Sequence, residues 1–146
     1  MSGIVCAIRG GPASDATVNL AIDLAKETGL PLSFLYVVNL DFLSRTSSSR
    51  VRTISEEMSQ MGEAILLTAQ DQVHSQGMVT RKFVRHGNVG QEIVQLCRDL
   101  EADYLILGLP ETEGRDNVFT QDSLKRFIRS LESQTGVQVM LPEGKP

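Results

Sequence analysis

Short apolar runs, separated by segments of helical periodicity, set the strongest constraint on how this chain can fold. Each run is brief, nearly continuous in apolar residues and bounded by turn residues, as buried strands are. The runs cover residues 4–8, 32–38, 78–84, 104–107 and 137–141. Between them apolar side chains recur every three or four positions, as in amphipathic helices. This strict alternation predicts an α/β fold with one doubly wound, five-stranded parallel sheet and helices on both faces.

The length and the third run refine this prediction. A chain of 146 residues is long enough to bury one core, so residues 1–146 are expected to form a single domain. In the third run the alternation of Val79, Lys82 and Val84 is imperfect. A strand of that kind suits the edge of a sheet, where one side remains accessible to solvent.

The segment between the second and third runs divides into a polar loop and a long helix. Residues 39–52 contain the low-complexity stretch SRTSSSR, so we expect an exposed and mobile loop there. Serines 47–49 lie between two arginines and could be phosphorylated, although a solvated loop is the simpler interpretation. A helix is expected over residues 54–75, with Met58 and Met61 directed into the core.

Charge and composition argue against several classes of partner. The 18 acidic residues outnumber the 14 basic ones, which are scattered, so no nucleic-acid partner is expected. No segment approaches the about 18 apolar residues of a membrane span. The first apolar run breaks off at Arg9, which predicts a strand rather than a signal peptide, and a cytoplasmic location follows by default. Cys6 and Cys97 form no CxxC pair, so both are predicted to be buried thiols rather than metal ligands.

The predicted topology indicates where a ligand would bind. Doubly wound sheets bind ligands outside the carboxyl ends of their strands, where the strand order reverses. Arg9, Gly10 and Gly11 follow the first strand at that edge. One interpretation is that Arg9 binds an anion together with the two glycines and the positive end of the first helix. The alternative is an internal ion pair between Arg9 and an acid of the long loop.

Three stretches of the sequence carry a resemblance to the universal stress proteins, and the resemblance extends over nearly the whole chain. They are GIVCAIRGGPAS at the start, then PLSFLYVV, then RHGNVGQEIVQLCRDLEADYLILGLP. The matching positions include Gly87, Glu92, Ile93, Ala102, Asp103 and Gly108. The resemblance implies a Rossmann-like sheet with strand order 3-2-1-4-5 and an adenine-nucleotide site. It also implies a homodimer paired through the last strand, residues 137–141, which would otherwise leave an apolar edge exposed.

Two features of the nucleotide-binding members of that family are altered in this chain. Arg9 stands where those members have an aspartate after the first strand. Their pattern G-x2-G-x9-G-S/T holds phosphates through backbone amides and a hydroxyl. Here Gly108 keeps the first position, Glu111 replaces the second glycine, and Ser123 matches the final hydroxyl only after a short insertion. Acids crowd this loop, Glu113 among them, and would repel a triphosphate unless a metal intervened. We therefore predict a degenerate ATP site.

The remaining candidate residues each have a structural alternative. By resemblance Val38 would line an adenine pocket, and otherwise it belongs to the strand core. Ser123 could bind a phosphate or cap the fourth helix. His86 and His74 are expected to have structural or solvent roles. No catalytic residue and no metal site is predicted, because no hydrolase triad or metal-ligand spacing occurs in the sequence.

Two functions follow as competing hypotheses. The first is a non-enzymatic binding or signalling module without a cofactor, which acts as a homodimer and could bind a protein partner. The alternative is a protein that binds ATP or AMP, with or without magnesium, through a modified site. The candidate residues of that site are Arg9, Gly10, Gly11, Val38, Gly108 and Ser123. A nucleotide-cleaving enzyme is a third hypothesis, for which the sequence offers no identifiable base or metal cluster.

Overall fold

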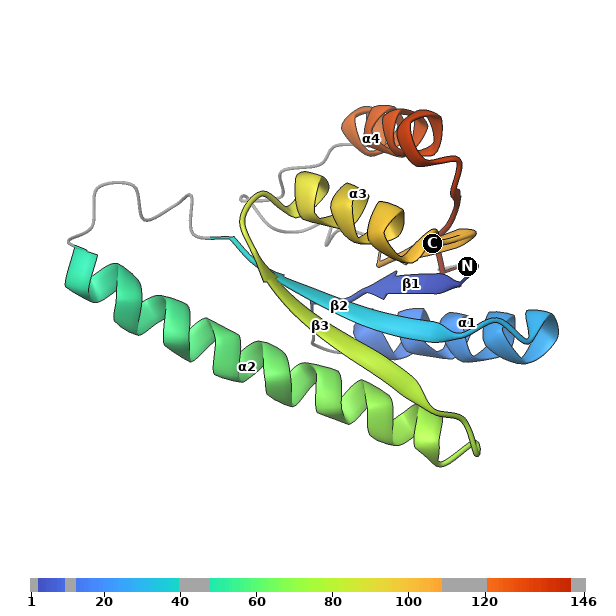
Figure 1. The fold of residues 1–146 in the computed structure, drawn as a ribbon, viewed down its shortest axis with the longest axis horizontal. Helices are drawn as coiled ribbons and strands as arrows, with labels where there is room; N and C mark the ends of the chain where they lie inside the picture. Colours follow the sequence, from blue (N-terminus) through green and yellow to red (C-terminus); the bar gives the residue numbers. More distant parts are fainter. Residues whose placement is uncertain (1–2, 10–12, 40–47, 109–120, 143–146) are drawn as a thin grey trace.

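The chain folds as alternating strands and helices (Figure 1). The computed structural model describes residues 3–9, 13–39, 48–108 and 121–142. Within these residues the order of elements is β1 (Ile4–Ala7), α1 (Ala13–Thr28), β2 (Leu32–Val38), α2 (Ser48–His74), β3 (Thr80–His86), α3 (Val89–Leu100), β4 (Tyr104–Leu107), α4 (Gln121–Thr135) and β5 (Gln138–Met140). The α/β alternation predicted from the apolar runs is confirmed.

All five strands are parallel and lie in the order β3-β2-β1-β4-β5. β1 is central, and its Cys6 lies opposite Phe34 of β2 on one side and Ile106 of β4 on the other. The strand order reverses between β1 and β4, so the carboxyl ends of these two strands form the switch point of the sheet. Both the predicted order and the predicted edge position of β3 are confirmed.

Two apolar layers cover the two faces of the sheet. Cys6, Phe34 and Ile106 belong to the layer that packs against α1 and α2. Val5 and Leu35 belong to the layer under α3 and α4. Successive strand residues point to opposite faces, so neighbours in sequence contribute to different layers. Figure 1 shows the same division, with one pair of helices on each side of the sheet. Helices on both faces were predicted and are confirmed.

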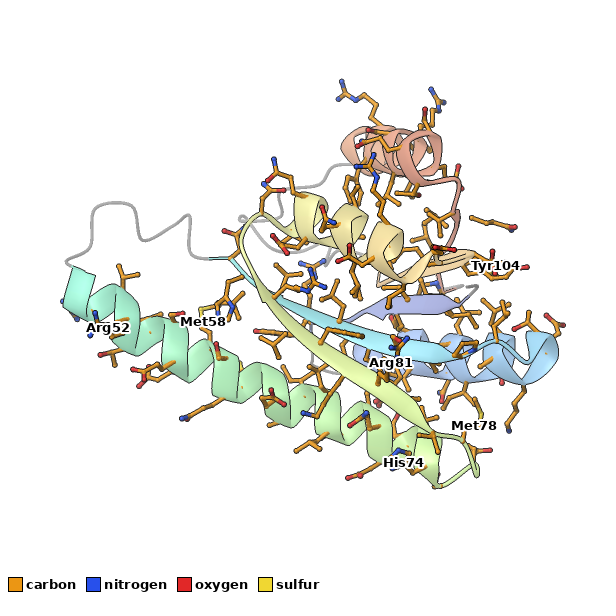
Figure 2. All side chains as sticks on the ribbon, viewed as in Figure 1. Arg52, Met58, His74, Met78, Arg81 and Tyr104 are labelled. Carbon is orange, nitrogen blue, oxygen red and sulfur yellow. The ribbon has the colours of Figure 1, made fainter. Side chains whose placement is uncertain are left out.

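The long helix begins earlier than the sequence pattern predicted. α2 starts at Ser48 rather than at residue 54, so residues 48–52 are helical and not part of a loop. No glycine or proline interrupts this stretch, and Val51 and Ile54 continue the half-buried stripe that includes Met58. Figure 2 shows Met58 on the side of α2 that faces the sheet. The expected mobility of the loop concerns residues 40–47, which lie outside the described residues.

One core prediction for α2 is wrong. Met61 is 56% exposed, because the buried face of α2 runs through Gly62, Leu66, Ala69 and Val73. Met61 lies to one side of that face, on a helix that packs only one narrow face on β2 and β3. None of the helices in the described ranges is both long and apolar enough to cross a membrane.

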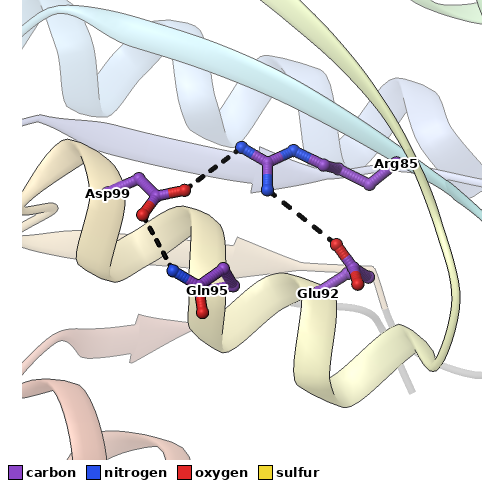
Figure 3. A network of polar contacts seen from close by, with 4 residues as sticks. All are labelled: Arg85, Glu92, Gln95 and Asp99. Carbon is purple, nitrogen blue, oxygen red and sulfur yellow. Dashed lines mark hydrogen bonds and ion pairs between the residues drawn. The ribbon is translucent and has the colours of Figure 1, made fainter.

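β3 is shifted by two residues from its predicted span of 78–84. The strand covers Thr80–His86, and Val79 before it is 86% exposed. Arg85 joins β3 to α3, since its guanidinium lies 3.3 Å from Asp99 Oδ2 and 3.9 Å from Glu92 Oε1. Figure 3 shows this network, in which Gln95 also donates to Asp99. These tertiary contacts extend the strand beyond the predicted end.

Candidate functional site

A cavity of about 940 Å³ opens where the carboxyl ends of β1, β2 and β4 meet α3 and α4. Ile8, Arg9, Asn39 and Gly108 line it at the strand ends. This is the switch point of the sheet, the location at which folds of this type bind ligands. Its volume lies within the roughly 300–1,000 Å³ of small-molecule sites.

The cavity has an apolar floor and a polar rim. Val37, Leu107 and Phe127 are among the apolar residues that line it. The polar residues include Arg9 and Asn88. An apolar floor with a few polar groups at its edge suits a ligand that carries a flat apolar part and an anionic part.

The start of α3 forms one wall of the cavity. Asn88 caps the helix, and its side-chain oxygen accepts a 3.0 Å hydrogen bond from the backbone N–H of Gln91. Gly90 lies in this first turn, and a Cβ atom added there would be 2.9 Å from Cε1 of Phe127. Gly90 therefore lets the ring of Phe127 in α4 approach the backbone of α3. The positive end of α3 faces the cavity and favours an anion there.

Arg9 is the cation at the strand end of the cavity. It is exposed and makes no ion pair or hydrogen bond with the described residues. The acids at positions 111, 113 and 116 lie outside the described residues, so the predicted alternative of an ion pair with that loop stays a prediction. Gly108 lines the same end, and a Cβ atom added there would be 3.2 Å from Oγ1 of Thr17 in α1.

The other candidate residues are not all brought to this cavity. Val38 is fully buried in the layer under α1 and α2, so it does not line the cavity, whereas its neighbour Val37 does. Ser123 is the third residue of α4, which begins at Gln121. It therefore does not cap that helix, and its side chain lies outside the described residues. Gly10 and Gly11 also lie outside the described residues.

His86 has a partner that the sequence did not reveal. Its Nε2 lies 2.8 Å from Oγ of Ser59 in α2, and the contact is exposed. Ser59 and His86 are 27 positions apart, so no sequence motif signals the pair. No contact of the other ring nitrogen with a described residue completes a catalytic triad. The contact between Ser59 and His86 ties α2 to the end of β3. The other histidine, His74, lies in the last turn of α2.

The two cysteines are buried thiols, as predicted. Burial raises the pKa of Cys97 to about 12 and also raises the pKa of Cys6. A thiol with so high a pKa carries almost no thiolate near neutral pH and is a poor nucleophile. Within the described ranges no group of three or more His, Cys, Asp or Glu side chains could hold a metal ion.

Comparison with known proteins places these features in a family. The model of the universal stress protein family matches residues 1–132. Among solved structures, the universal stress protein UspA from Lactobacillus plantarum is similar with a TM-score of 0.78 and 14% identity, covering 97% of both chains. A universal stress protein from Archaeoglobus fulgidus in complex with dAMP has a TM-score of 0.63 and 13% identity over 98% of both chains.

A third structure is a universal stress protein in complex with cAMP. It has a TM-score of 0.66 and 17% identity, and the match covers 99% of this chain and 98% of that chain. The comparison with curated proteins gave no match. At these identities the structures support the fold, and the match of the family model over most of the chain supports the relationship.

Proposed function

Because the chain belongs to the universal stress protein family, we propose that it is a non-enzymatic binding module whose cavity takes an adenine nucleotide with a short phosphate chain. The observation that carries this proposal is the position of the cavity, at the switch point between β1 and β4, with Arg9 at its edge. Two similar family members were solved with dAMP and cAMP, each of which carries a single phosphate.

The charges of the cavity and of the sequence that follows Gly108 favour a short phosphate chain over a triphosphate. Arg9 and the positive end of α3 attract one anionic group. In the sequence, Glu111, Glu113 and Asp116 follow Gly108 closely, and carboxylates repel the outer phosphates of a triphosphate. The ATP site is degenerate in this proposal because Arg9 replaces an acid and Glu111 replaces a phosphate-binding glycine.

Titration calorimetry with AMP, cAMP and ATP plus magnesium tests this proposal. AMP or cAMP is expected to bind at least tenfold more tightly than ATP. The Arg9→Gln variant is expected to bind AMP about 10- to 100-fold more weakly, because a hydrogen bond to a charged group contributes about 1.5–3 kcal/mol. Arg52→Gln is the matched control, since Arg52 is an exposed arginine of α2 that does not line the cavity. If none of the three nucleotides binds, the proposed nucleotide binding is wrong, although the chain keeps the fold of the family.

A homodimer through β5 is a second proposal, supported by the position of this strand. β5 lies at the edge of the sheet and pairs only with β4 among the described strands. Val139 and Met140 are half-buried, and a second copy would cover them and the open edge. One edge donor is already engaged, since the N–H of Val139 donates to Glu132 Oε2 at 3.0 Å. Glu132 therefore competes with a partner strand for this N–H.

Analytical ultracentrifugation over a wide range of protein concentration tests the dimer. Glu132→Ala is expected to strengthen self-association, because it frees the N–H of Val139. Gln138→Lys is expected to weaken it, because each copy would bring a positive charge on β5 to the shared edge. Gln138 is exposed, so this substitution spares the fold. A monomer at every concentration, with all three proteins alike, would rule out pairing through β5.

A further inference from the structure

α3 and α4 contact each other at two levels and leave a groove between them. Near the start of α3 the ring of Phe127 lies against Gly90. Near its end Nη2 of Arg98 donates to the backbone oxygen of Gln134 at 3.5 Å. Eight residues separate Gly90 from Arg98, which corresponds to about 12 Å along an α-helix. Residues at both levels line the cavity described above, so the cavity continues from the strand ends into this groove.

The two helix faces that line the groove are rich in uncharged polar groups. On each helix the residues follow the i, i+3, i+4, i+7 spacing of one face. From α3 they include Gln91, Val94, Gln95 and Arg98, and from α4 they are Phe127, Ser130, Leu131 and Gln134. Glu92 of α3 also lines the cavity, and its carboxylate lies 3.9 Å from Nη1 of Arg85. Val94 and Leu131 supply apolar surface, and the amides, the hydroxyl and the guanidinium supply polar groups.

These polar groups retain both donors and acceptors for a ligand. The amide nitrogen of Gln95 donates to Asp99, and that of Gln134 donates to Ser130, which leaves both amide oxygens as acceptors. In its one contact with a described residue Ser130 accepts, so among these residues its own proton remains available to donate. In the described part of the chain the guanidinium of Arg98 makes one long hydrogen bond and no ion pair. Five N–H donors are present in a guanidinium, so Arg98 has donors to spare.

Groups that both donate and accept hydrogen bonds match this arrangement best, and hydroxyls are the simplest of them. A simple anion would use the donors of Arg98 but not the amide oxygens. An alkyl chain would use Val94 and Leu131 but would desolvate the amides without replacing their hydrogen bonds. A sugar offers hydroxyls at its edges and C–H groups on its faces, and so satisfies both kinds of surface.

We infer that the groove between α3 and α4 is a second subsite, which binds a sugar joined to the phosphate end of the adenine nucleotide. This inference rests on the proposed nucleotide site at the strand ends. The base and first phosphate occupy the end of the cavity near Arg9, and the sugar lies along the groove toward Arg98. The ligand class is therefore a nucleoside diphosphate sugar, larger than the mononucleotides bound by the similar family members.

Calorimetry with ADP and ADP-ribose measures the contribution of the terminal sugar. The wild-type protein is expected to bind ADP-ribose at least tenfold more tightly than ADP. Arg98→Met is expected to remove this difference and to leave the affinity for ADP itself within about twofold, since a methionine keeps the apolar length of the side chain but has no N–H donor. Arg129→Met is the matched control, because Arg129 is an exposed residue of α4 that does not line the cavity.

The outcomes separate this inference from the proposed function. Equal affinities for ADP and ADP-ribose in the wild-type protein would overturn the sugar subsite and leave the nucleotide site intact. A difference that survives Arg98→Met would place the sugar elsewhere and would also overturn it. No binding of AMP, ADP or ADP-ribose would overturn both. A direct check is titration with ribose 5-phosphate, which is expected to shift the side-chain amide NMR signals of Gln91, Gln95 and Gln134.

Discussion

Gly62 of α2 packs directly against the ring of Tyr36 in β2, and a Cβ atom built on the glycine would overlap that ring. This glycine lies in the interior of α2 and is buried. A helix interior normally disfavours glycine by about 1 kcal/mol relative to alanine. The close approach of α2 to the sheet therefore explains why a glycine stands at this position.

Gly62→Ala is expected to lower the free energy of unfolding despite the gain in helix propensity. Overpacking in a core costs about 1–3 kcal/mol, which exceeds the gain of about 1 kcal/mol from propensity. Chemical denaturation measures the difference. In a Tyr36→Val background the overlap is absent and the same substitution should raise stability. If Gly62→Ala changed the free energy of unfolding equally in both backgrounds, the ring of Tyr36 would not be the reason why the substitution destabilises the protein.

Thr80→Val is expected to stabilise the protein by about 1 kcal/mol. Oγ1 of Thr80 is buried and has no hydrogen-bond partner among the described residues, so its desolvation is uncompensated. Valine keeps the shape and favours the strand conformation. Thr135→Val is the control, since Oγ1 of Thr135 donates to Leu131 and accepts from Val137. That substitution should destabilise the protein, and a loss of stability in both variants would contradict the account.

Arg85→Met is expected to cost about 1 kcal/mol more stability than Arg81→Met. Both arginines flank the ring of Phe83, but only Arg85 pairs with Glu92 and Asp99 of α3, with a side chain that is 28% exposed. Partly buried pairs contribute more than exposed ones. Urea denaturation of the two variants gives the difference, which should shrink in high salt. Equal losses would mean that the ion pairs contribute nothing beyond the ring contact.

Stability is expected to fall at alkaline pH because of the buried thiols. The ordinary pKa of a cysteine is 9.0, and burial raises that of Cys97 to about 12. Above pH 9 the unfolded chain loses thiol protons that the folded chain retains, so each thiol lowers stability by at most about 1.4 kcal/mol per pH unit. The stability contributed by the protonated, buried thiol of Cys97 is fully present below pH 9 and is lost as the pH rises toward 12. Cys97→Ala should show a shallower decline between these values, and an unchanged slope would contradict the assignment.

The fold was predictable because the alternation of apolar runs and helical segments leaves few topologies open. Element boundaries were less predictable where tertiary contacts decide them. Ser48 begins α2 because Val51 and Ile54 extend its half-buried stripe, and these two residues alone give too short a pattern to mark a helix. β3 extends to His86 through its pairing with β2 and the contacts of Arg85 with α3.

The position of the cavity was predictable, but most of the residues that line it were not. The switch-point rule indicated the ends of β1 and β4 as the place where a ligand would bind, and Arg9 and Gly108 line the cavity there. Because side chains alternate along a strand, Val37 and Val38 are predicted to point to opposite faces of the sheet. The sequence does not indicate which of the two faces carries the cavity. The cavity-lining residues of α3 and α4, such as Val94 and Ser130, are brought to one cavity only through helix packing, since each helix shows only its own periodicity.

An NMR titration of the isotope-labelled protein with AMP tests the central claim most directly. The claim is that the cavity at the carboxyl edge of the sheet binds an adenine nucleotide. It predicts saturable shifts of the backbone amides of Arg9, Gly90 and Gly108, with those of α2 unchanged. Shifts confined to residues outside the cavity, or no shifts at any AMP concentration, would contradict the claim.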